Sequence, residues 1–415
     1  MFDTDLYKEI WQAVSKNKMR SILTAFGVFW GLFMLITLYG MGNGLQNGVE
    51  NQFKNIAKNS SVMYTSRTTI PYGGFRRNHW WEFNNSDVVA VNRQFPELDA
   101  VVPRIMNWSS TGVTYNLRSS DCNIVGEYPV TTRVEYLNMV YGRYINDIDI
   151  KNRRKVCVIG PRVRENLFPN GEDPIGKNVN VGGVYYTVVG SYNVRDNITL
   201  GFDSETAVRL PFTTMQQTYN RGDEVDMLLI AAKPTQDIGD VEDDVMRFIR
   251  SRHKDVSPDD TEALQHVNLA KQFGQISNLF LGVDILIWLV GLGTLLAGII
   301  GISNIMLVIV KERTQEIGIK RAIGASPANI IKQIMMESVL LTIVAGYLGL
   351  VIGVLINEGL GLALSSEDSI FLNPGIDLNV GLICLTILII SGACAGLLPA
   401  MRAVKIKPID AIREE

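Results

Sequence analysis

Four long apolar runs stand out along the chain, one near its start and three near its end. Residues 22–41 carry no charged side chain, and at about 1.5 Å per helical residue they cross a hydrocarbon layer of about 30 Å. The other runs occupy residues 279–310, 334–357 and 380–400. We therefore predict four transmembrane helices, the first at residues 21–43. A cleaved signal peptide is a weaker interpretation of the first run, because acidic residues interrupt the segment before it.

The residues between the first two runs have the mixed composition of a water-soluble domain. Residues 44–278 alternate between apolar and polar positions. Their periodicities predict strands at residues 62–69, 100–106, 155–159, 179–189 and 227–232, and helices at residues 85–94, 162–167 and 238–252. The predicted fold class is an integral membrane α-helical protein. A large extracytoplasmic mixed α/β domain is inserted between transmembrane helices one and two, with stalk segments beside the membrane.

Charges beside the apolar runs predict the orientation, because lysine and arginine gather in short cytoplasmic segments. They occur in three places: Lys8, Lys16, Lys18 and Arg20; Lys311, Arg313, Lys320, Arg321 and Lys332; and Arg402, Lys405, Lys407 and Arg413. Residues 358–379 contain acidic residues and no lysine or arginine. We expect residues 1–20, 311–333 and 401–415 in the cytoplasm, the first of these as an amphipathic segment. Residues 44–278 and the loop at residues 358–379 then lie outside.

Composition excludes some classes of protein. The formal net charge is -3 and there is no basic run, so nucleic-acid binding is not expected. The cysteines, at Cys122, Cys157, Cys384 and Cys394, form no CxxC pair, which argues against a zinc site. The last two lie about 15 Å apart along one predicted helix, too far to bridge. A disulfide between Cys122 and Cys157 stays open.

The predicted spans contain small residues four apart, a spacing that lets helix backbones approach closely. The pairs are Gly27 and Gly31, Ala297 and Gly301, Gly349 and Gly353, and Gly392 and Gly396. A glycine merely tolerated in a membrane helix explains any single pair equally well. The few ionisable residues of the spans lie near their ends, so no polar pathway crosses the bilayer. We expect a compact bundle or a dimer.

Residues 311–325 run out of the second span with the sequence KERTQEIGIKRAIGA. Their charge and helix-forming residues predict a short surface helix at the inner membrane face, ended by Gly324 and Pro327. A solvated, positively charged loop explains the charge equally well. Three isoleucines, Ile317, Ile319 and Ile323, are expected to be exposed beside these charges, which favours a docking surface for a cytoplasmic partner.

This stretch resembles the FtsX-like, MacB-type permeases of ABC transporters. The match is closest at NIMLVIVKERTQEIGIKRAIGA, residues 304–325, and recurs at GLLPA and MRAVKIKPIDAIR, residues 396–413. It extends to KMRSILT before the first span, and to the outer-domain motifs YGR, LF, DPIGK and LPFT. The resemblance covers nearly the whole chain. The cytoplasmic motif is highly specific and the outer motifs are moderately so.

The resemblance implies that the surface helix is a coupling helix on which a cytoplasmic ABC ATPase sits. Its implied contact residues are Lys311, Glu312, Arg313, Glu316, Ile317, Gly318, Arg321, Ala322, Gly324 and Ala325, with Glu316 and Gly318 at the centre. A second cytoplasmic contact is implied at Arg402, Lys405, Pro408 and Arg413. Two permeases, as a homodimer or a related heterodimer, would join two ATPases that bind ATP and Mg, with no cofactor on this chain.

The resemblance further implies a multi-pass protein of the bacterial inner membrane, with its large domain in the periplasm. That domain would be a ferredoxin-like porter unit, built from both ends of the segment, with a β-rich unit inserted near its middle. A periplasmic adaptor and an outer-membrane duct would complete a tripartite efflux or secretion machine. Force, rather than substrate, would cross the membrane.

Candidate catalytic and metal motifs are weak. Residues 171–177, GEDPIGK, have the glycine and lysine spacing of a phosphate loop, but Asn178 replaces the hydroxyl residue and Pro174 lacks an N–H. A turn entering a β-hairpin is the better interpretation. The histidines, at His79, His253 and His266, have no metal-ligand spacing. We therefore expect no catalytic residues, no metal site and no enzyme activity on this chain.

An aromatic cluster in the central segment, Phe75, Trp80, Trp81 and Phe83, is interleaved with Arg76 and Arg77. It is interpreted as a local core or a membrane-surface rim, with a partner-binding surface as the weaker alternative.

Other functions remain open beside efflux. Within the family these are lipoprotein release and regulation of cell-wall hydrolases, although hydrolase-regulating members usually have a smaller outer domain. From another class, a membrane-anchored sensor would need no ATPase, and the coupling motif argues against it.

Overall fold

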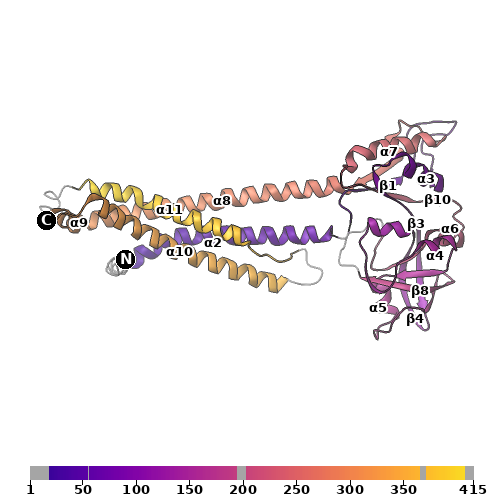
Figure 1. Cartoon of the computed structure of the whole chain (residues 1–415), viewed down its shortest axis with the longest axis horizontal. Coiled ribbons are helices and arrows are strands. Elements are labelled where there is room, and N and C mark those ends of the chain that lie inside the picture. Colours follow the sequence, from indigo (N-terminus) through magenta and orange to yellow (C-terminus); the bar gives the residue numbers. More distant parts are fainter. Residues whose placement is uncertain (1–17, 55, 194–201, 365–370, 407–415) are drawn as a thin grey trace. The chain divides into compact units, whose positions relative to one another are not determined.

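The structure is a computed structural model that describes residues 18–54, 56–193, 202–364 and 371–406. The chain divides into two units (Figure 1). The helical unit comprises Met1–Val49 and Asn278–Glu415, and the α/β unit comprises Glu50–Ser277.

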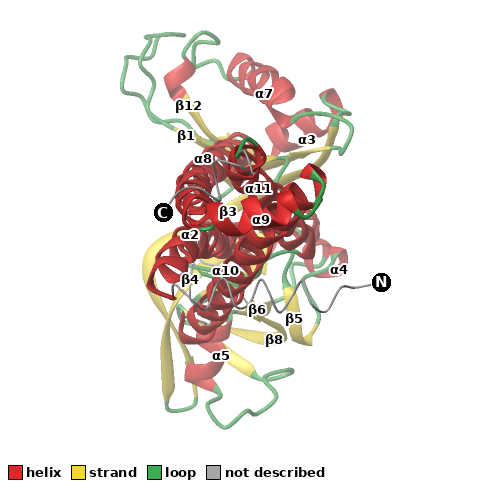
Figure 2. Cartoon of the chain, turned by 90° about the vertical axis from the view of Figure 1, so that its left-hand side faces the viewer, coloured by secondary structure: helices red, strands yellow, loops and turns green. Residues whose placement is uncertain are grey.

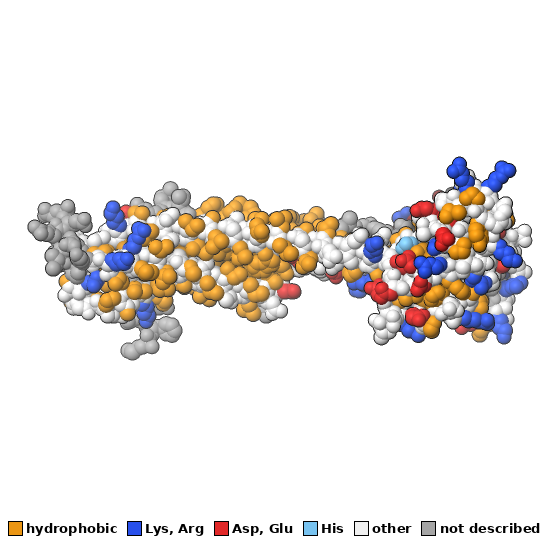
Figure 3. Space-filling view, turned by 90° about the horizontal axis from the view of Figure 1, so that it is seen from above, with side chains coloured by type: hydrophobic (Ala, Val, Ile, Leu, Met, Phe, Trp, Pro, Cys, Tyr) orange, Lys and Arg blue, Asp and Glu red, His pale blue; other side chains and the backbone are white. Residues whose placement is uncertain are grey.

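Long apolar helices make up the helical unit. They are α2 (Lys18–Gln52), α8 (Leu269–Glu312), α10 (Pro327–Leu364) and α11 (Leu378–Val404). Within the described residues, these four are long and apolar enough to cross a membrane. Hydrophobic side chains cover the visible face of this unit, and lysine and arginine gather toward the end that carries the short helix α9 (Thr314–Ala322) (Figure 3). The prediction of four transmembrane helices is confirmed.

Glycines allow the helices of this unit to touch through their backbones. A methyl group on Gly27 would lie 3.2 Å from the Cα of Gly298, and one on Gly349 would lie 2.6 Å from the carbonyl oxygen of Phe29. Backbone or side-chain atoms of neighbouring helices also lie within 3.2 Å of such a methyl group on Gly31, Gly353, Gly392 and Gly396. By contrast, nothing lies within 4 Å of such a group on Gly301. Gly298, one turn earlier, makes the contact that the sequence pattern assigns to Gly301.

Polar side chains inside the helical unit bond to the backbone of neighbouring helices. The Asn357 amide donates to the Ile36 carbonyl at 2.9 Å, and the Ser338 hydroxyl donates to the Gly392 carbonyl at 3.0 Å. Two turns further along α2 from Ile36, the Asn43 amide donates to the Gly375 carbonyl at 2.8 Å. These bonds hold α2 against α10, α10 against α11, and the connection before α11 against α2.

The α/β unit contains a split ferredoxin-like fold. Its elements are β1 (Ser60–Thr65), α3 (Asn85–Gln94), β3 (Leu98–Tyr115), β11 (Met227–Ala232), α7 (Ile238–Arg252) and β12 (Leu264–Asn268). The strands pair antiparallel in the order β12-β1-β11-β3, and α3 and α7 pack together over this sheet (Figure 2). A β-α-β-β-α-β succession in this order is the ferredoxin-like arrangement, as the resemblance implies.

A second, β-rich subdomain is inserted between β3 and β11. It contains β4 (Arg118–Glu127), η1 (Pro129–Arg133), β5 (Asn138–Gly142), α4 (Asp147–Lys151), β6 (Val156–Ile159), α5 (Pro161–Leu167), β7 (Asn178–Val181), β8 (Val184–Asn193), β9 (Ala207–Pro211) and α6 (Phe212–Thr218). Its pairings β3-β4-β9-β6-β8-β7-β3 close into a ring. The long strand β3 therefore belongs to both subdomains. A small ribbon joins β2 (Phe83–Asn84) to β10 (Glu224–Val225), and η2 (Thr261–Ala263) precedes β12.

Most predicted elements are found, with two differences. The predicted strand at residues 179–189 is a hairpin, because Gly182 and Gly183 adopt positive φ and form the turn between β7 and β8. The aromatic cluster divides: Trp81 and Phe83 are core residues, whereas Phe75 and Trp80 are 45% and 53% exposed. The cysteines are free, and both Cys122 and Cys157 are buried.

The close approach at Gly349 makes a first prediction. Gly349→Ala places a methyl group against the Phe29 backbone, so it should destabilise the helical unit by about 1–3 kcal/mol despite the better helix propensity of alanine. Gly359→Ala, on the same helix with open space around it, is the matched control and should unfold at the same or a higher temperature than the wild type. Thermal unfolding of the detergent-solubilised chain measures both. Equal unfolding temperatures for the two variants would contradict the packing described.

Candidate functional site

The predicted coupling segment forms α9, a short helix between two membrane-spanning helices (Figure 1). The long helix α8 ends at Glu312, and Arg313 leaves helical geometry before α9 begins at Thr314. The helix ends at Ala322, Gly324 follows with a φ of 102° that glycine adopts readily, and Pro327 starts α10. Glycine and proline thus bound α9 as the sequence predicts.

Arg313 ties α9 to α10 through two carboxylates. Its guanidinium donates to both oxygens of Glu316, at 2.8 and 3.0 Å, and to Glu337 of α10 at 3.0 Å. The hydrogen bonds with Glu316 raise the pKa of Arg313 and lower the pKa of Glu316. Both side chains are therefore charged at neutral pH, and a bidentate pair of this kind fixes orientation as well as distance.

Arg321 ties α9 to the end of α11. Its guanidinium donates to the carbonyl oxygens of Val404 and Ile406, at 2.7 and 2.6 Å. These carbonyls lie at the C-terminal end of the helix, where a cation also favours the helix dipole. The predicted second contact region therefore lies beside α9: Arg402 and Lys405 are exposed there, while Pro408 and Arg413 fall outside the described residues.

The inner face of α9 packs against the bundle. Ile317 is buried with Val310, Ile330 and Ile334, and Gly318 is buried next to it. This corrects the expectation that Ile317 is exposed. Positions 317, 318 and 321 share one helical face, and Arg321 fixes that face toward α11.

The outer face of α9 is exposed and apolar. Ile319 is 45% exposed and Ile323 is 82% exposed, and Ala322 between them is also exposed. We call these three residues the α9 face. Exposed charged residues, Lys311, Glu312 and Glu316, flank it. Gly324 is exposed after the helix and Ala325 is half-buried. An exposed apolar patch rimmed by charge is the usual composition of a protein-binding surface.

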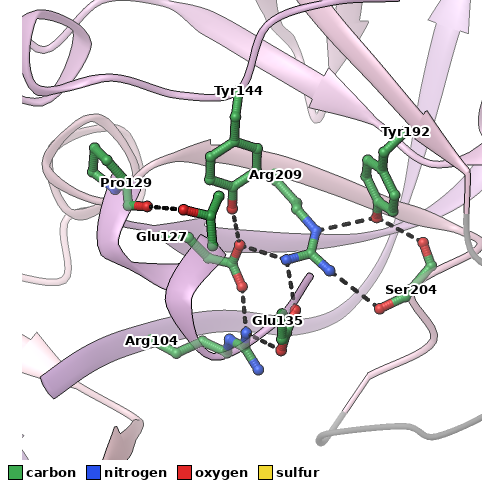
Figure 4. A network of polar contacts seen from close by, with 9 residues as sticks. Arg104, Glu127, Pro129, Glu135, Tyr144, Tyr192, Ser204 and Arg209 are labelled. Atoms are coloured by element: carbon green, nitrogen blue, oxygen red, sulfur yellow. Dashed lines mark hydrogen bonds and ion pairs between the residues drawn. The ribbon is translucent and has the colours of Figure 1, made fainter. Parts of the chain in front are cut away.

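The α/β unit contains a cluster of buried charges that no sequence pattern indicates (Figure 4). Arg104 and Glu127 are fully buried on β3 and β4, Arg209 is fully buried on β9, and Glu135 follows η1. Arg104 lies 2.6 Å from Glu127 and 2.5 Å from Glu135. Arg209 lies 2.7 Å from Glu127 and 2.9 Å from Glu135. Each guanidinium thus contacts both carboxylates, and the four charges balance.

Aromatic and hydroxyl groups surround this cluster (Figure 4). The Tyr144 hydroxyl donates to Glu127. Arg209 donates to the Tyr192 hydroxyl at 3.1 Å, which in turn donates to the Ser204 carbonyl at 2.7 Å. The Phe202 ring lies over both guanidiniums, 4.9 Å from Arg104 and 5.3 Å from Arg209. Excluding water in this way strengthens every ion pair of the cluster.

The cluster lies where the two subdomains of the α/β unit meet. Arg104 is the last β3 residue paired with β11, and Ile105 is the first paired with β4. The segment that carries Glu135 also holds the chain that leaves α2: the Ala57 amide donates to the Val134 carbonyl at 2.7 Å. The cluster therefore joins both sheets and the connection from α2.

Together, the fold and α9 define a class of protein: a multi-pass membrane protein with a large domain inserted after its first span and a presented helix between its second and third. Residues 21–248 match the family model described as MacB-like periplasmic core domain, and residues 288–408 match FtsX-like permease C-terminal. The chain belongs to the family of MacB-like, FtsX-type ABC transporter permeases. Its α/β unit is the extracytoplasmic domain.

Curated relatives cover almost the whole chain. It is 26% identical over 414 residues to the macrolide export ATP-binding/permease protein MacB of Bdellovibrio bacteriovorus, covering 97% of this chain and 61% of that protein. It is 24% identical over 415 residues to the pyoverdine export ATP-binding/permease protein PvdT of Pseudomonas syringae pv. syringae, covering 99% of this chain and 59% of that protein. The chain thus spans about 60% of the length of these relatives.

Among solved structures, the periplasmic region of MacB from Actinobacillus actinomycetemcomitans matches with 19% identity. The match covers 56% of this chain and 99% of that one, with a TM-score of 0.44.

The buried charges make a second prediction. Burial alone raises the pKa of Glu135, but Arg104 and Arg209 lower it to about 2. Its contribution to stability is therefore complete above its ordinary pKa of 4.5 and is lost as the pH falls to about 2. Glu135→Gln should lower the free energy of unfolding by about 3–5 kcal/mol at pH 7, and the difference from wild type should shrink as the pH falls.

Near-UV circular dichroism during thermal unfolding at several pH values measures this difference. Glu165→Gln is the control, because Glu165 is 70% exposed and its removal should leave stability unchanged at every pH. A destabilisation by Glu135→Gln that is independent of pH would contradict the charged state assigned to Glu135.

Proposed function

We propose that this chain is the permease subunit of an ABC exporter, which transmits ATP-driven motion from a cytoplasmic ATPase to its extracytoplasmic domain. In this role α9 is the coupling helix that the ATPase holds. ATP and Mg belong to the ATPase, and this chain hydrolyses no ATP. The named functions of the MacB and PvdT relatives, export of macrolides and of pyoverdine, support an export role without identifying the substrate.

The observation that carries the proposal is the anchorage of α9. A helix that receives force must present a contact surface and must not move independently of the spans behind it. The α9 face supplies exposed apolar area, while Arg313 and Arg321 connect the opposite side to α10 and α11. A displacement applied to α9 is therefore passed to both helices rather than absorbed by a loop.

The assembly we propose contains two permease copies, identical or related, with two ATPase subunits. Both termini and α9 lie in the cytoplasm of a bacterium, the helices cross its inner membrane, and the α/β domain lies in the periplasm. The charge distribution beside the spans supports this orientation. A periplasmic adaptor and an outer-membrane duct would complete a tripartite exporter, by analogy with the family.

The test is recovery of an ATPase with the tagged chain from its native membrane. Ile323→Asp places a charge on the most exposed residue of the α9 face and disturbs no packing, because Ile323 is 82% exposed. It should reduce the recovered ATPase at least about ten-fold, since a well-buried apolar contact in an interface is worth about 2 kcal/mol. Quantitative mass spectrometry of the eluate measures this ratio.

Leu362→Asp is the matched control: Leu362 has the same exposed fraction, 82%, at the other end of α10. It should leave the recovered ATPase unchanged. Glu316→Lys, which also breaks the bidentate pair with Arg313, should abolish recovery. If no ATPase accompanies the wild-type chain, the coupling role is wrong and a membrane-anchored sensor becomes the function to pursue.

A further inference from the structure

The α/β unit has an open hollow of about 340 Å³ that is separate from the buried charge cluster. Its lining is Tyr64, Thr65, Trp80, Glu82, Asp226 and Met227. Tyr64 and Met227 are register partners on β1 and β11, so together they form one continuous surface of the hollow. Hollows of this size with a largely apolar lining and a few convergent polar groups are the usual form of small-molecule sites.

Trp80 is exposed but is held by its loop. The Thr68 amide donates to the His79 carbonyl at 3.0 Å, and the Asn78 amide donates to the Thr68 carbonyl at 2.6 Å. These two bonds close the loop just before Trp80. The Trp80 indole N–H then donates to Glu82 at 3.1 Å. Trp80 is 53% exposed, but the closed loop fixes its backbone and the bond to Glu82 fixes the indole N–H. An oriented aromatic surface that water still reaches is available to a ligand.

Two carboxylates converge on the hollow from distant parts of the sequence. The β2–β10 ribbon pairs Phe83 with Val225, so Glu82 and Asp226 stand opposite each other one residue further along. Asp226 already pairs with Arg221 at 2.5 Å. That arginine also pairs with Glu224 at 2.6 Å. Among the described residues, Glu82 forms no ion pair with a lysine, arginine or histidine.

The local charge is therefore negative. The lining contains two carboxylates, Glu82 and Asp226, and no basic residue among those described. Arg221 pairs with Asp226 from outside the lining. A cation placed beside Glu82 would lie near the Trp80 and Tyr64 rings, where cation–π attraction adds to the attraction of the carboxylate. An anion in the same place would instead be repelled by the carboxylate of Glu82.

We propose that this hollow is a binding site for an organic cation, a protonated amine or quaternary ammonium attached to an apolar or aromatic body. The ammonium lies beside Glu82 and against the Trp80 face. The apolar body covers Tyr64 and Met227. This site does not depend on the coupling role of α9, so the two proposals succeed or fail separately.

Saturation-transfer difference NMR on the full chain in nanodiscs of zwitterionic lipid tests the site, with empty nanodiscs subtracted. The probe is benzyltrimethylammonium, and phenylacetate is its anionic counterpart with the same benzyl body. We expect saturable binding of the cation and none of the anion. Trp80→Ala and Glu82→Gln should each weaken binding of the cation about ten-fold, whereas Trp80→Phe, which keeps an aromatic face, should retain most of it.

Matched controls are Tyr185→Ala and Glu165→Gln, because these side chains are 66% and 70% exposed elsewhere on the same unit. Both should bind like the wild type. Unchanged thermal unfolding of Trp80→Ala and Glu82→Gln excludes loss of the fold as the cause of weaker binding. The proposal is overturned if the cation fails to saturate, if phenylacetate binds equally well, or if these two variants bind the cation as the wild type does.

Discussion

A bilayer interior offers no water to a polar group, so each such group inside it must find a partner within the protein. Much of the helical unit follows from this constraint. Two buried side chains bond to the backbone of a neighbouring helix in this way, Asn357 to Ile36 and Ser338 to Gly392. Glu337, which is buried, faces Arg313 at the end of the bundle. Few polar side chains are available to hold the helices together, so much of the contact between helices comes from glycines that let the backbones approach closely.

In both units, arginine side chains join elements that are otherwise separate. Arg313 and Arg321 fasten a short helix to two long ones with bidentate or paired bonds. In the α/β unit, Arg104 and Arg209 fasten two sheets and the chain from α2. Arginine suits both positions, because its planar fork makes several directed bonds and it stays charged when buried. Removing one partner from the buried cluster would leave the others without a compensating charge, which is costly in a dry interior.

Much of this structure could be predicted from the sequence, because the signals are local. Apolar runs and flanking charge predict the spans, Gly324 and Pro327 bound α9, and periodicity predicts α3, β11 and α7 with the residues observed. The charge cluster could not be predicted, because Arg104, Glu127, Glu135 and Arg209 are far apart in sequence and each lies in an ordinary strand or loop. The inward face of α9 was equally hidden, since a nine-residue helix shows its periodicity only against the helices that cover it.

The strand β3 has a consequence for how this domain can vary among relatives. Its first part, up to Arg104, belongs to the ferredoxin-like sheet, and its second part, from Ile105, belongs to the closed ring. Side chains alternate between the two faces of a strand. An insertion or deletion of one residue at this point would therefore move the buried side chains of one subdomain to the opposite face. Length changes can accumulate in hairpins such as the one between β7 and β8. The shared strand, in contrast, must keep its length if both subdomains are to keep their buried faces.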